Sequence, residues 1–206
     1  MKQGTAEWHA ARCGKATASR IADIVARTKT GWGASRANYC AELVAERLTG
    51  VPAEGFKSAA MQWGTETEDQ ARAAYEFYRS VTVTEVGFIS HPTIPLSGAS
   101  PDGFVGESGL LEIKCPSTAT HISTLLGAPI AKSYHLQIQW QMACTHREWC
   151  DFVSFDPRMP EELRLYVSRF ERVIITDIEK QVIEFLAEVA EKEAALRALM
   201  TRREAA

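Results

Sequence analysis

Short apolar segments along this 206-residue chain predict β-strands. Residues 81–89 alternate between apolar and polar side chains and are rich in β-branched types, so they predict one strand. Residues 110–115 form a mostly apolar run behind a Gly-Glu-Ser-Gly turn, which predicts a buried strand with a polar interruption. Residues 149–155 and 163–170 predict two further strands, joined by a turn that contains proline.

Apolar side chains that recur every three or four residues predict helices elsewhere in the chain. Thr5 and Ser35 are candidate N-caps, because their hydroxyls can accept from free backbone N–H groups of the first turn. Gly14 and Gly50 mark helix ends, because glycine readily adopts the left-handed conformation. The predicted helices cover residues 5–12, 17–25, 35–49, 58–79, 117–126 and 132–145, and a last one begins at residue 176.

The composition predicts one domain over residues 1–206, because no linker rich in Pro, Gly or Ser divides the chain. No apolar run approaches about eighteen residues and no charged-then-apolar leader opens the sequence, so we expect a cytoplasmic protein without a membrane span. The five cysteines show no CxxC or Cys/His zinc pattern, which predicts reduced thiols in the core.

The net charge of −3 at pH 7 argues at first against a nucleic-acid partner, since phosphate binding usually requires a basic excess. The distribution of charge changes that conclusion. Residues 1–57 carry nine basic and five acidic side chains, a net charge of +4, whereas the remaining 149 residues carry 14 basic and 21 acidic, a net charge of −7. The N-terminal quarter is therefore the expected phosphate-facing surface.

Two carboxylates and an ammonium group come together in the predicted hairpin within residues 97–117. Because strand side chains alternate between faces, Glu112 and Lys114 point the same way and Ile113 points into the other layer. A Pro-Asp-Gly turn places Asp102 beside Glu112. Carboxylates about 4 Å apart repel by roughly 4 kcal/mol at an effective dielectric of about 20, so the pair favours a cation such as Mg²⁺ or Mn²⁺. The alternative is a surface Glu-Lys pair, which contributes only about 0–1 kcal/mol.

The pattern Pro-Asp, nine residues, Glu-x-Lys resembles the PD-(D/E)xK nuclease motif, and its flanks ASPDG and LEIKCP resemble the lambda-exonuclease branch of that superfamily. This resemblance implies an α/β fold with a restriction-endonuclease-like core, in which helices flank a mixed central sheet and the active site lies at one sheet edge. It also implies two Mg²⁺ ions, replaceable by Mn²⁺, held by Asp102, Glu112 and the Ile113 carbonyl. Lys114 would then position or activate the attacking water.

Other segments resemble the same family in order along the chain. W-H-x-x-R-x-G-x-x-T-A-S matches the family's opening, where the residues that correspond to Arg12 and Ser19 bind the DNA 5′-phosphate. H-L-Q-I-Q-W-Q-M matches the helix after the motif lysine, and Gln137 corresponds to a glutamine beside the scissile or terminal phosphate. Ser100 corresponds to a serine near that phosphate. From residue types alone, these are helix caps, a solvated arginine and solvated glutamines.

Glu66 and Glu68 lie in the segment WGTETEDQAR, where two residues on a helix are about 200° apart, so only one can face the site. The resemblance, in W-G-x-x-x-E-x-x-A-R, assigns Glu68 as a catalytic residue close to the metals and a candidate further ligand. Glu66 is expected to be solvated. The basic loop of residues 27–34 matches one that approaches DNA in the family, so Lys29 is a candidate minor-groove or backbone contact; an ordinary surface loop is the alternative.

The resemblance implies Mg²⁺-dependent exonuclease activity on linear double-stranded DNA, from 5′ to 3′, which releases mononucleotides and leaves a 3′ single strand for phage-type recombination by strand annealing. It also implies a ring-shaped homotrimer around the DNA, a single-strand annealing protein as partner, and a location in the cytoplasm of a bacterial or phage-infected cell. Two alternatives stay open: an endonuclease of the same superfamily, and a non-catalytic DNA-end binding module that has kept the fold.

Overall fold

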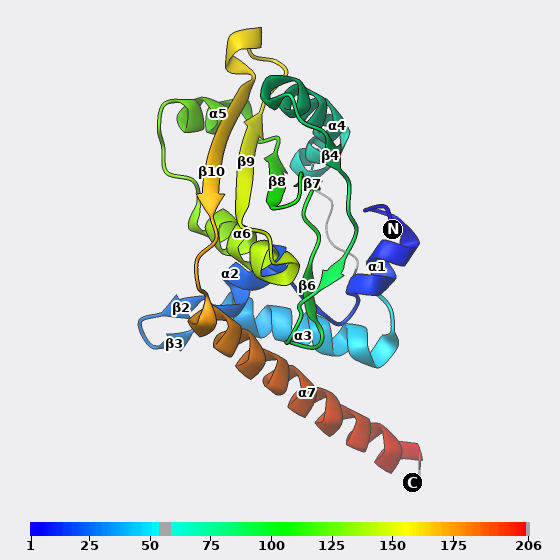
Figure 1. The fold of residues 1–206 in the computed structure, drawn as a ribbon. Coiled ribbons are helices and arrows are strands. Elements are labelled where there is room, and N and C mark those ends of the chain that lie inside the picture. The colour runs from blue at the N-terminus through cyan, green and yellow to red at the C-terminus, as the bar shows by residue number, and fades with distance from the viewer. Residues whose placement is uncertain (54–58, 205–206) are drawn as a thin grey trace.

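The computed structural model describes residues 1–53 and 59–204, and its largest sheet has five strands in the order β10-β9-β8-β7-β4 (Figure 1). The central strands β8 and β9 are parallel, and the other neighbouring pairs of this sheet are antiparallel. The strand predicted at residues 110–115 is β8, and its side chains are almost all buried. The strands are β4 Val83–Thr84, β7 Gly103–Val105, β8 Gly109–Lys114, β9 Trp149–Phe155 and β10 Leu165–Glu171.

A three-stranded sheet, in the order β1-β6-β5, precedes the hairpin of β7 and β8. β1 and β6 are parallel, and Thr17 pairs with Gly98. Only residues 100–102 separate β6 from β7, so this short link joins the two sheets. β2 and β3 form a separate hairpin. The bounds are β1 Ala16–Thr17, β2 Arg27–Thr28, β3 Gly31–Trp32, β5 Ile89–Ser90 and β6 Ser97–Ala99.

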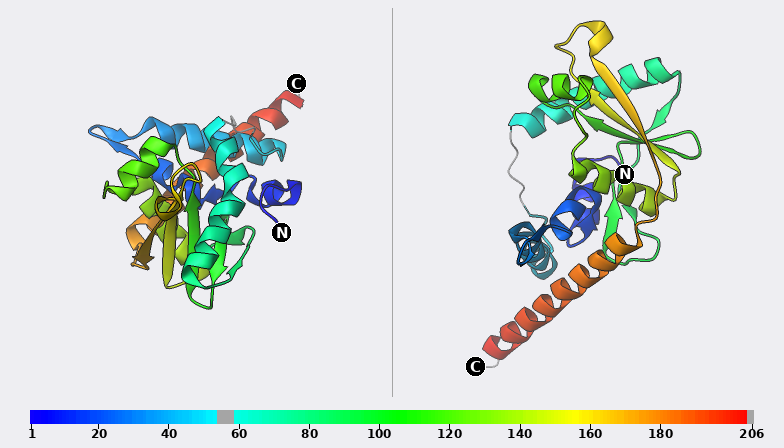
Figure 2. Two further views of the ribbon diagram at one scale, coloured as in Figure 1. Left: turned by 90° about the horizontal axis from the view of Figure 1, so that it is seen from above. Right: turned by 90° about the vertical axis from the view of Figure 1, so that its left-hand side faces the viewer.

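Helices pack on both faces of the five-stranded sheet (Figures 1 and 2). On one face, α4 packs Tyr75 against Ile113, and on the other face α6 packs Ile138 and Met142 against Leu110. The last helix, α7, packs along α3 and extends away from the sheets (Figure 2). The α-helices are α1 Ala6–Arg12, α2 Ile21–Ile24, α3 Ala34–Thr49, α4 Ala59–Arg79, α5 Thr118–Leu125, α6 Lys132–Thr145 and α7 Thr176–Glu204, and Ala18–Arg20 and Glu161–Leu163 form short 3-10 helices.

Most of the predicted helices are confirmed. The Thr5 hydroxyl caps α1 by accepting from the Trp8 N–H at 3.3 Å. Gly50 ends α3 in the left-handed conformation, with φ of 69°, and α6 has the predicted bounds. The predicted start of the fourth helix, Ser58, lies outside the described residues, and α4 is described from Ala59.

The single strand predicted for residues 81–89 is wrong, because β4 and β5 belong to different sheets. The start of the chain lies against the backbone between them. Gln3 Nε2 donates to the Val86 carbonyl at 3.1 Å, and a Cβ on Gly87 would lie 2.5 Å from the Met1 carbonyl oxygen. Tertiary contacts with the N-terminus therefore override the local strand pattern.

Two helix starts and one strand start also differ from the prediction. The segment expected to be helical from residue 17 begins as the end of β1 and the 3-10 helix Ala18–Arg20, because Thr17 pairs with β6. Ser35 does not cap α3, which begins after Gly33 and has no side-chain cap. The last strand begins at Leu165 instead of residue 163, because Glu161–Leu163 form a 3-10 helix.

The five cysteines are unpaired, and Cys40, Cys144 and Cys150 are buried. Burial raises the pKa of the Cys150 thiol well above its ordinary value, so this thiol stays protonated. Within residues 1–53 and 59–204, no helix combines the length and the apolar character that a membrane crossing requires.

Asp151 on β9 is fully buried and joins α4 to β10. Its carboxylate accepts from the Tyr75 hydroxyl at 2.8 Å and from Arg169 at 2.8 and 3.0 Å. We expect Asp151→Ala to lower the free energy of unfolding by about 2–4 kcal/mol, because it leaves the buried Tyr75 hydroxyl unpaired and removes the carboxylate that faces Arg169. Urea unfolding followed by circular dichroism measures this change.

Asp69→Ala is the matched control, because the Asp69 side chain is 88% exposed and pairs with Arg72 on the surface of α4. We expect this substitution to change the free energy of unfolding by no more than about 0.5 kcal/mol. An equally small change for Asp151→Ala would show that the buried network does not stabilise the fold.

Candidate active site

The β7–β8 hairpin brings together the two carboxylates of the predicted metal site. β7 and β8 pair in antiparallel register, so Asp102, directly before β7, lies opposite Glu112. The Asp102 carboxylate also accepts from the Ile113 N–H at 2.6 Å. Because Glu112 and Lys114 alternate with Ile113 along β8, both point to the face of the sheet that α6 covers.

Glu112 is almost fully enclosed, with 1% of its surface exposed. Its Oε1 accepts from Lys114 Nζ at 2.5 Å and from Gln137 Nε2 at 2.6 Å. Its Oε2 accepts from Gln141 Nε2 at 2.6 Å. Gln137 and Gln141 lie one turn apart on α6, so a single helix supplies both amides. These donors offset the cost of removing the carboxylate from water.

The charged groups of the site act strongly on one another. Burial raises the pKa of Asp102 well above its ordinary value, and the Glu112 carboxylate raises it further, while Lys114 opposes both effects. Burial lowers the pKa of Lys114, but the Glu112 and Asp102 carboxylates outweigh burial and hold it above its ordinary value. Two carboxylates thus share one ammonium group, and a further positive charge would stabilise the pair.

The donors of this site fit a magnesium ion. Asp102 and Glu112 supply carboxylate oxygens, and Ile113 is the predicted source of a backbone oxygen; Mg²⁺ and Mn²⁺ prefer such ligands. Among the described residues, no three His, Cys, Asp or Glu side chains form a group that could hold a metal ion. The two carboxylates match the binding mode of Mg²⁺, which commonly binds through one or two carboxylates and keeps several water ligands.

Glu68 does not join the two carboxylates directly. It lies on α4, which packs on the opposite face of the sheet, and its carboxylate accepts from Arg72 Nη2 at 2.8 Å. Burial raises the pKa of Glu68, Arg72 lowers it and Glu112 raises it again, so Glu68 and Glu112 are close enough to repel. Glu66 is exposed and accepts from Gln62, as expected for a solvated side chain.

Arg12, Trp8 and Ser100 form a second polar cluster beside the carboxylates. Ser100 Oγ accepts from Trp8 Nε1 at 3.0 Å and from Arg12 Nη1 at 3.2 Å. The Arg12 guanidinium lies over the Trp8 ring, 4.1 Å from its centre. Because Ser100 is two residues before Asp102, this cluster adjoins the carboxylate pair along the link between the two sheets.

Arg12 forms no ion pair with a carboxylate in the part of the chain that the structure describes. Burial lowers the pKa of its guanidinium, and Tyr39 and Glu46 act in the opposite direction. A partly buried guanidinium without an ion-pair partner is suited to an incoming phosphate, which it can bind through two parallel hydrogen bonds.

Ser19 lies at the same end of the β1–β6 pair as Ser100. The two strands are parallel and Thr17 pairs with Gly98, so the residues two positions further on leave the sheet in the same direction. Ser19 is exposed, and its hydroxyl lies 3.5 Å from that of Thr17. It belongs to a 3-10 helix, so the predicted position at the start of an α-helix is wrong.

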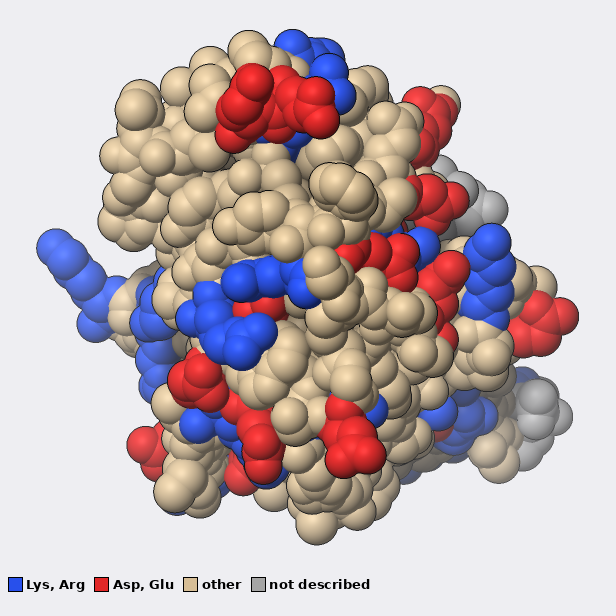
Figure 3. Space-filling view, turned by 45° about the horizontal axis from the view of Figure 1, so that its top comes forward, with Lys and Arg blue, Asp and Glu red and all other residues tan. Residues whose placement is uncertain are grey.

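Lys29 is exposed between β2 and β3, apart from the carboxylates. On the same hairpin, Trp32 lies between the guanidinium groups of Arg27 and Arg36, which are 3.6 and 3.9 Å from its ring centre. Lys and Arg side chains project at the left edge of Figure 3, on the side where Figure 1 places this hairpin. Elsewhere on the face in Figure 3, basic and acidic side chains are intermixed.

Gln141 and Trp8 contact predicted site residues but have no role in the sequence-based prediction. The spacing of Gln137 and Gln141 indicates a shared helix face, and it could have identified Gln141 once Gln137 was assigned. Trp8 stands in the matched N-terminal motif, yet no local pattern indicates its hydrogen bond to Ser100, 92 residues away.

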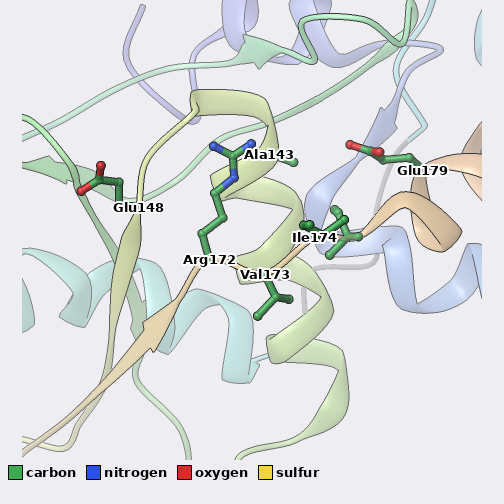
Figure 4. A pocket seen from close by; sticks show the side chains of 7 residues that line it. Ala143, Glu148, Arg172, Val173, Ile174 and Glu179 are labelled. Atoms are coloured by element: carbon green, nitrogen blue, oxygen red, sulfur yellow. The ribbon is translucent and has the colours of Figure 1, made fainter.

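Two surface hollows lie away from these clusters, around the segment between β10 and α7. One has a volume of about 510 Å³ and is lined in part by Glu148, Arg172 and Glu179 (Figure 4). The other has a volume of about 830 Å³ and is lined in part by Leu136 and Phe170. Neither hollow is lined by a predicted site residue. The candidate site is therefore identified by the chemistry of its side chains and not by the size of a cavity.

Known proteins resemble this chain over most of its length. The model of the YqaJ-like viral recombinase domain matches residues 7–148. An alkaline exonuclease (LHK-Exo) from Laribacter hongkongensis is 50% identical in sequence, and its structure matches with a TM-score of 0.89. The match covers 96% of this chain and 99% of that protein. A structure of the same protein in complex with dAMP has the same identity, coverage and TM-score. A phage-related exonuclease from Haemophilus somnus 129PT is 15% identical, covers 90% of this chain and 96% of its own, and shows the fold, with a TM-score of 0.65. The search of curated proteins finds no match.

These similarities confirm the α/β fold with a restriction-endonuclease-like core that the sequence predicts. The segment that matches the family, residues 7–148, contains Arg12, the β7–β8 hairpin and both glutamines of α6. The chain belongs to the YqaJ-like viral recombinase domain family.

Proposed function

We propose that this protein is a Mg²⁺-dependent exonuclease that degrades linear double-stranded DNA from 5′ to 3′, releases mononucleotides and leaves a 3′ single strand. The observation that carries the proposal is the link from Ser100 to Asp102. It places a guanidinium and hydroxyl cluster suited to a phosphate directly beside a carboxylate pair suited to a metal ion. A protein with these two sites adjacent can hold a DNA end and cut next to it.

The relatives support exonuclease chemistry on DNA. The Laribacter hongkongensis protein, 50% identical over almost the whole chain, is an alkaline exonuclease. Its complex with dAMP agrees with a deoxynucleoside monophosphate as the product that we propose here.

In the proposed mechanism, Asp102, Glu112 and the Ile113 carbonyl would hold the cation. When bound, Mg²⁺ lowers the pKa of water and neutralises charge on the phosphate that is cut. Lys114 donates to Glu112 and lies on the same face of β8, where it orients the attacking water. Glu68, on α4, lies near Glu112 and Lys114, and its carboxylate accepts a hydrogen bond from Arg72.

Gln137 and the N-terminal cluster position the DNA. Gln137 donates to the same Glu112 oxygen as Lys114, so its amide lies beside the expected place of the scissile phosphate. Arg12, Ser19 and Ser100 bind the 5′-phosphate, and this fixes the direction of digestion because only that end fits beside the carboxylates. Lys29 contacts the duplex backbone or its minor groove.

The proposal includes a ring-shaped homotrimer that encloses the duplex and a single-strand annealing protein that receives the 3′ strand. Both rest on the resemblance to lambda exonuclease. The site of action is then the cytoplasm of a bacterial or phage-infected cell, where the DNA substrate lies.

End-labelled linear duplex and a covalently closed circle of the same sequence test the activity. With Mg²⁺ we expect the linear duplex to lose its 5′ label first and to release acid-soluble mononucleotides, while the circle stays intact; a chelator should stop release. Gel electrophoresis and chromatography of the products measure these outcomes. Equal cutting of the circle would identify an endonuclease, and binding to ends without release would identify a non-catalytic module.

Asp102→Asn tests the carboxylate pair, because the amide oxygen can still accept from the Ile113 N–H while the charge is removed. We expect the rate of mononucleotide release to fall by about 10³-fold or more, since the cation loses a charged ligand. The circular dichroism spectrum should match that of the unsubstituted protein. Undiminished release by a folded variant would remove Asp102 from the metal site.

Arg12→Ala tests the end-binding cluster. We expect the preference for 5′-phosphorylated over 5′-hydroxyl ends to fall by about 10- to 100-fold, as for a charged hydrogen bond of roughly 1.5–3 kcal/mol, while Mn²⁺ binding in the absence of DNA is unchanged. Initial rates on the two kinds of end measure the preference. Arg197→Ala on α7 is the control and should keep it. Equal losses on both ends for Arg12→Ala would contradict a phosphate-binding role.

A further inference from the structure

Gln141 is fully buried, yet only one end of its amide has a partner. Its Nε2 donates to Glu112 Oε2 at 2.6 Å. Its Oε1 has no hydrogen-bond partner among the described residues. An unpaired buried acceptor is costly, and an apolar side chain of the same length would remove that cost. The bond to the Glu112 carboxylate is therefore the contact that accounts for an amide at this position.

The two oxygens of Glu112 are held differently. Oε1 accepts from Lys114 and from Gln137, and both of these side chains are partly exposed. Oε2 accepts from Gln141, which no solvent reaches. Substrate can therefore compete for the donors of Oε1, but the donor of Oε2 stays in place.

The backbone of α6 holds the Gln141 amide in position. Trp140 and Met142, on either side of it, are fully buried, and the Thr145 hydroxyl donates to the main-chain carbonyl of Gln141 at 2.8 Å. Because the Gln141 side chain is itself fully buried, few rotamers are open to it, and its hydrogen bond restricts rotation of the Glu112 carboxylate about its last bond.

We infer that Gln141 is a positioning residue for the cation site: its amide fixes the orientation of the Glu112 carboxylate, and the affinity for a divalent cation depends on that bond. This inference rests on the proposed function, because it needs Glu112 to be a ligand. It assigns Gln141 no contact with DNA or with the reacting atoms.

Gln141→Met is the decisive variant, because methionine keeps the length of the side chain and removes the donor. We expect the dissociation constant for Mn²⁺, measured by calorimetry on the full chain without DNA, to rise by about 10- to 100-fold, as for other residues that orient a metal ligand. The midpoint of urea unfolding should change little, because the lost donor to Glu112 and the removed unpaired oxygen of Gln141 act in opposite directions. The Mg²⁺ concentration that half-saturates activity should rise by the same factor, with the maximal rate recovered at saturating Mg²⁺.

Gln139→Met is the matched control on the same helix. Gln139 Nε2 donates to the Glu171 carbonyl, and its Oε1 accepts from the Val173 N–H, both at 2.9 Å, so its bonds lead away from the carboxylates. We expect this variant to bind Mn²⁺ as the unsubstituted protein does, whatever its effect on unfolding.

Gln141→Asn is the second variant, because it keeps an amide but shortens its reach; we expect the same loss of Mn²⁺ affinity. The inference is overturned if either folded variant binds Mn²⁺ within twofold of the unsubstituted protein, or if neither variant folds, since the residue would then be structural. If the unsubstituted protein itself binds no Mn²⁺, the metal dependence of the proposed function fails, and this inference fails with it. Binding by the unsubstituted protein and equal binding by Gln141→Met overturns the inference alone.

Discussion

The site is built around a carboxylate that has almost no contact with water. A carboxylate ion removed from water loses several kcal/mol of solvation, so Glu112 needs donors around it. β8 supplies the ammonium of Lys114, and α6 supplies the amides of Gln137 and Gln141. This need constrains the larger structure, because both amides reach one carboxylate only if α6 keeps a fixed position along the central strand.

Because side chains alternate along β8, one face of the sheet packs an apolar core and the other carries the charged residues of the site. Ile113 packs into the apolar layer under α4, while Glu112 and Lys114 face α6. This division explains why Glu68, on α4, stays paired with Arg72 and only approaches the carboxylates. The face that stabilises the sheet and the face that carries the proposed chemistry thus meet in one strand of six residues.

Features set by neighbours in sequence could be predicted, and those set by tertiary contacts could not. The strand at residues 110–115 and the hairpin around it follow from alternation and turn residues, which act locally. The bond between Arg12 and Ser100 could not be derived from local pattern, because 88 residues separate them and the parallel pairing of β1 with β6 brings them together. Residues 81–89 have a strand pattern that contacts with the N-terminus override. The spacing of Gln137 and Gln141 indicates that they share a helix face, but the contact of both with Glu112 depends on how α6 lies against β8.

The link of residues 100–102 has a consequence for what the proposed enzyme removes at each step. An extended chain spans at most about 3.5 Å per residue, so the Cα atoms of Ser100 and Asp102 are no more than about 7 Å apart. Pro101 between them has a restricted φ, which stiffens the link. In the proposed function, the DNA 5′-phosphate at Ser100 and the cation at Asp102 are then held a short, fixed distance apart. That distance, and not the sequence of the DNA, would set the size of the piece removed.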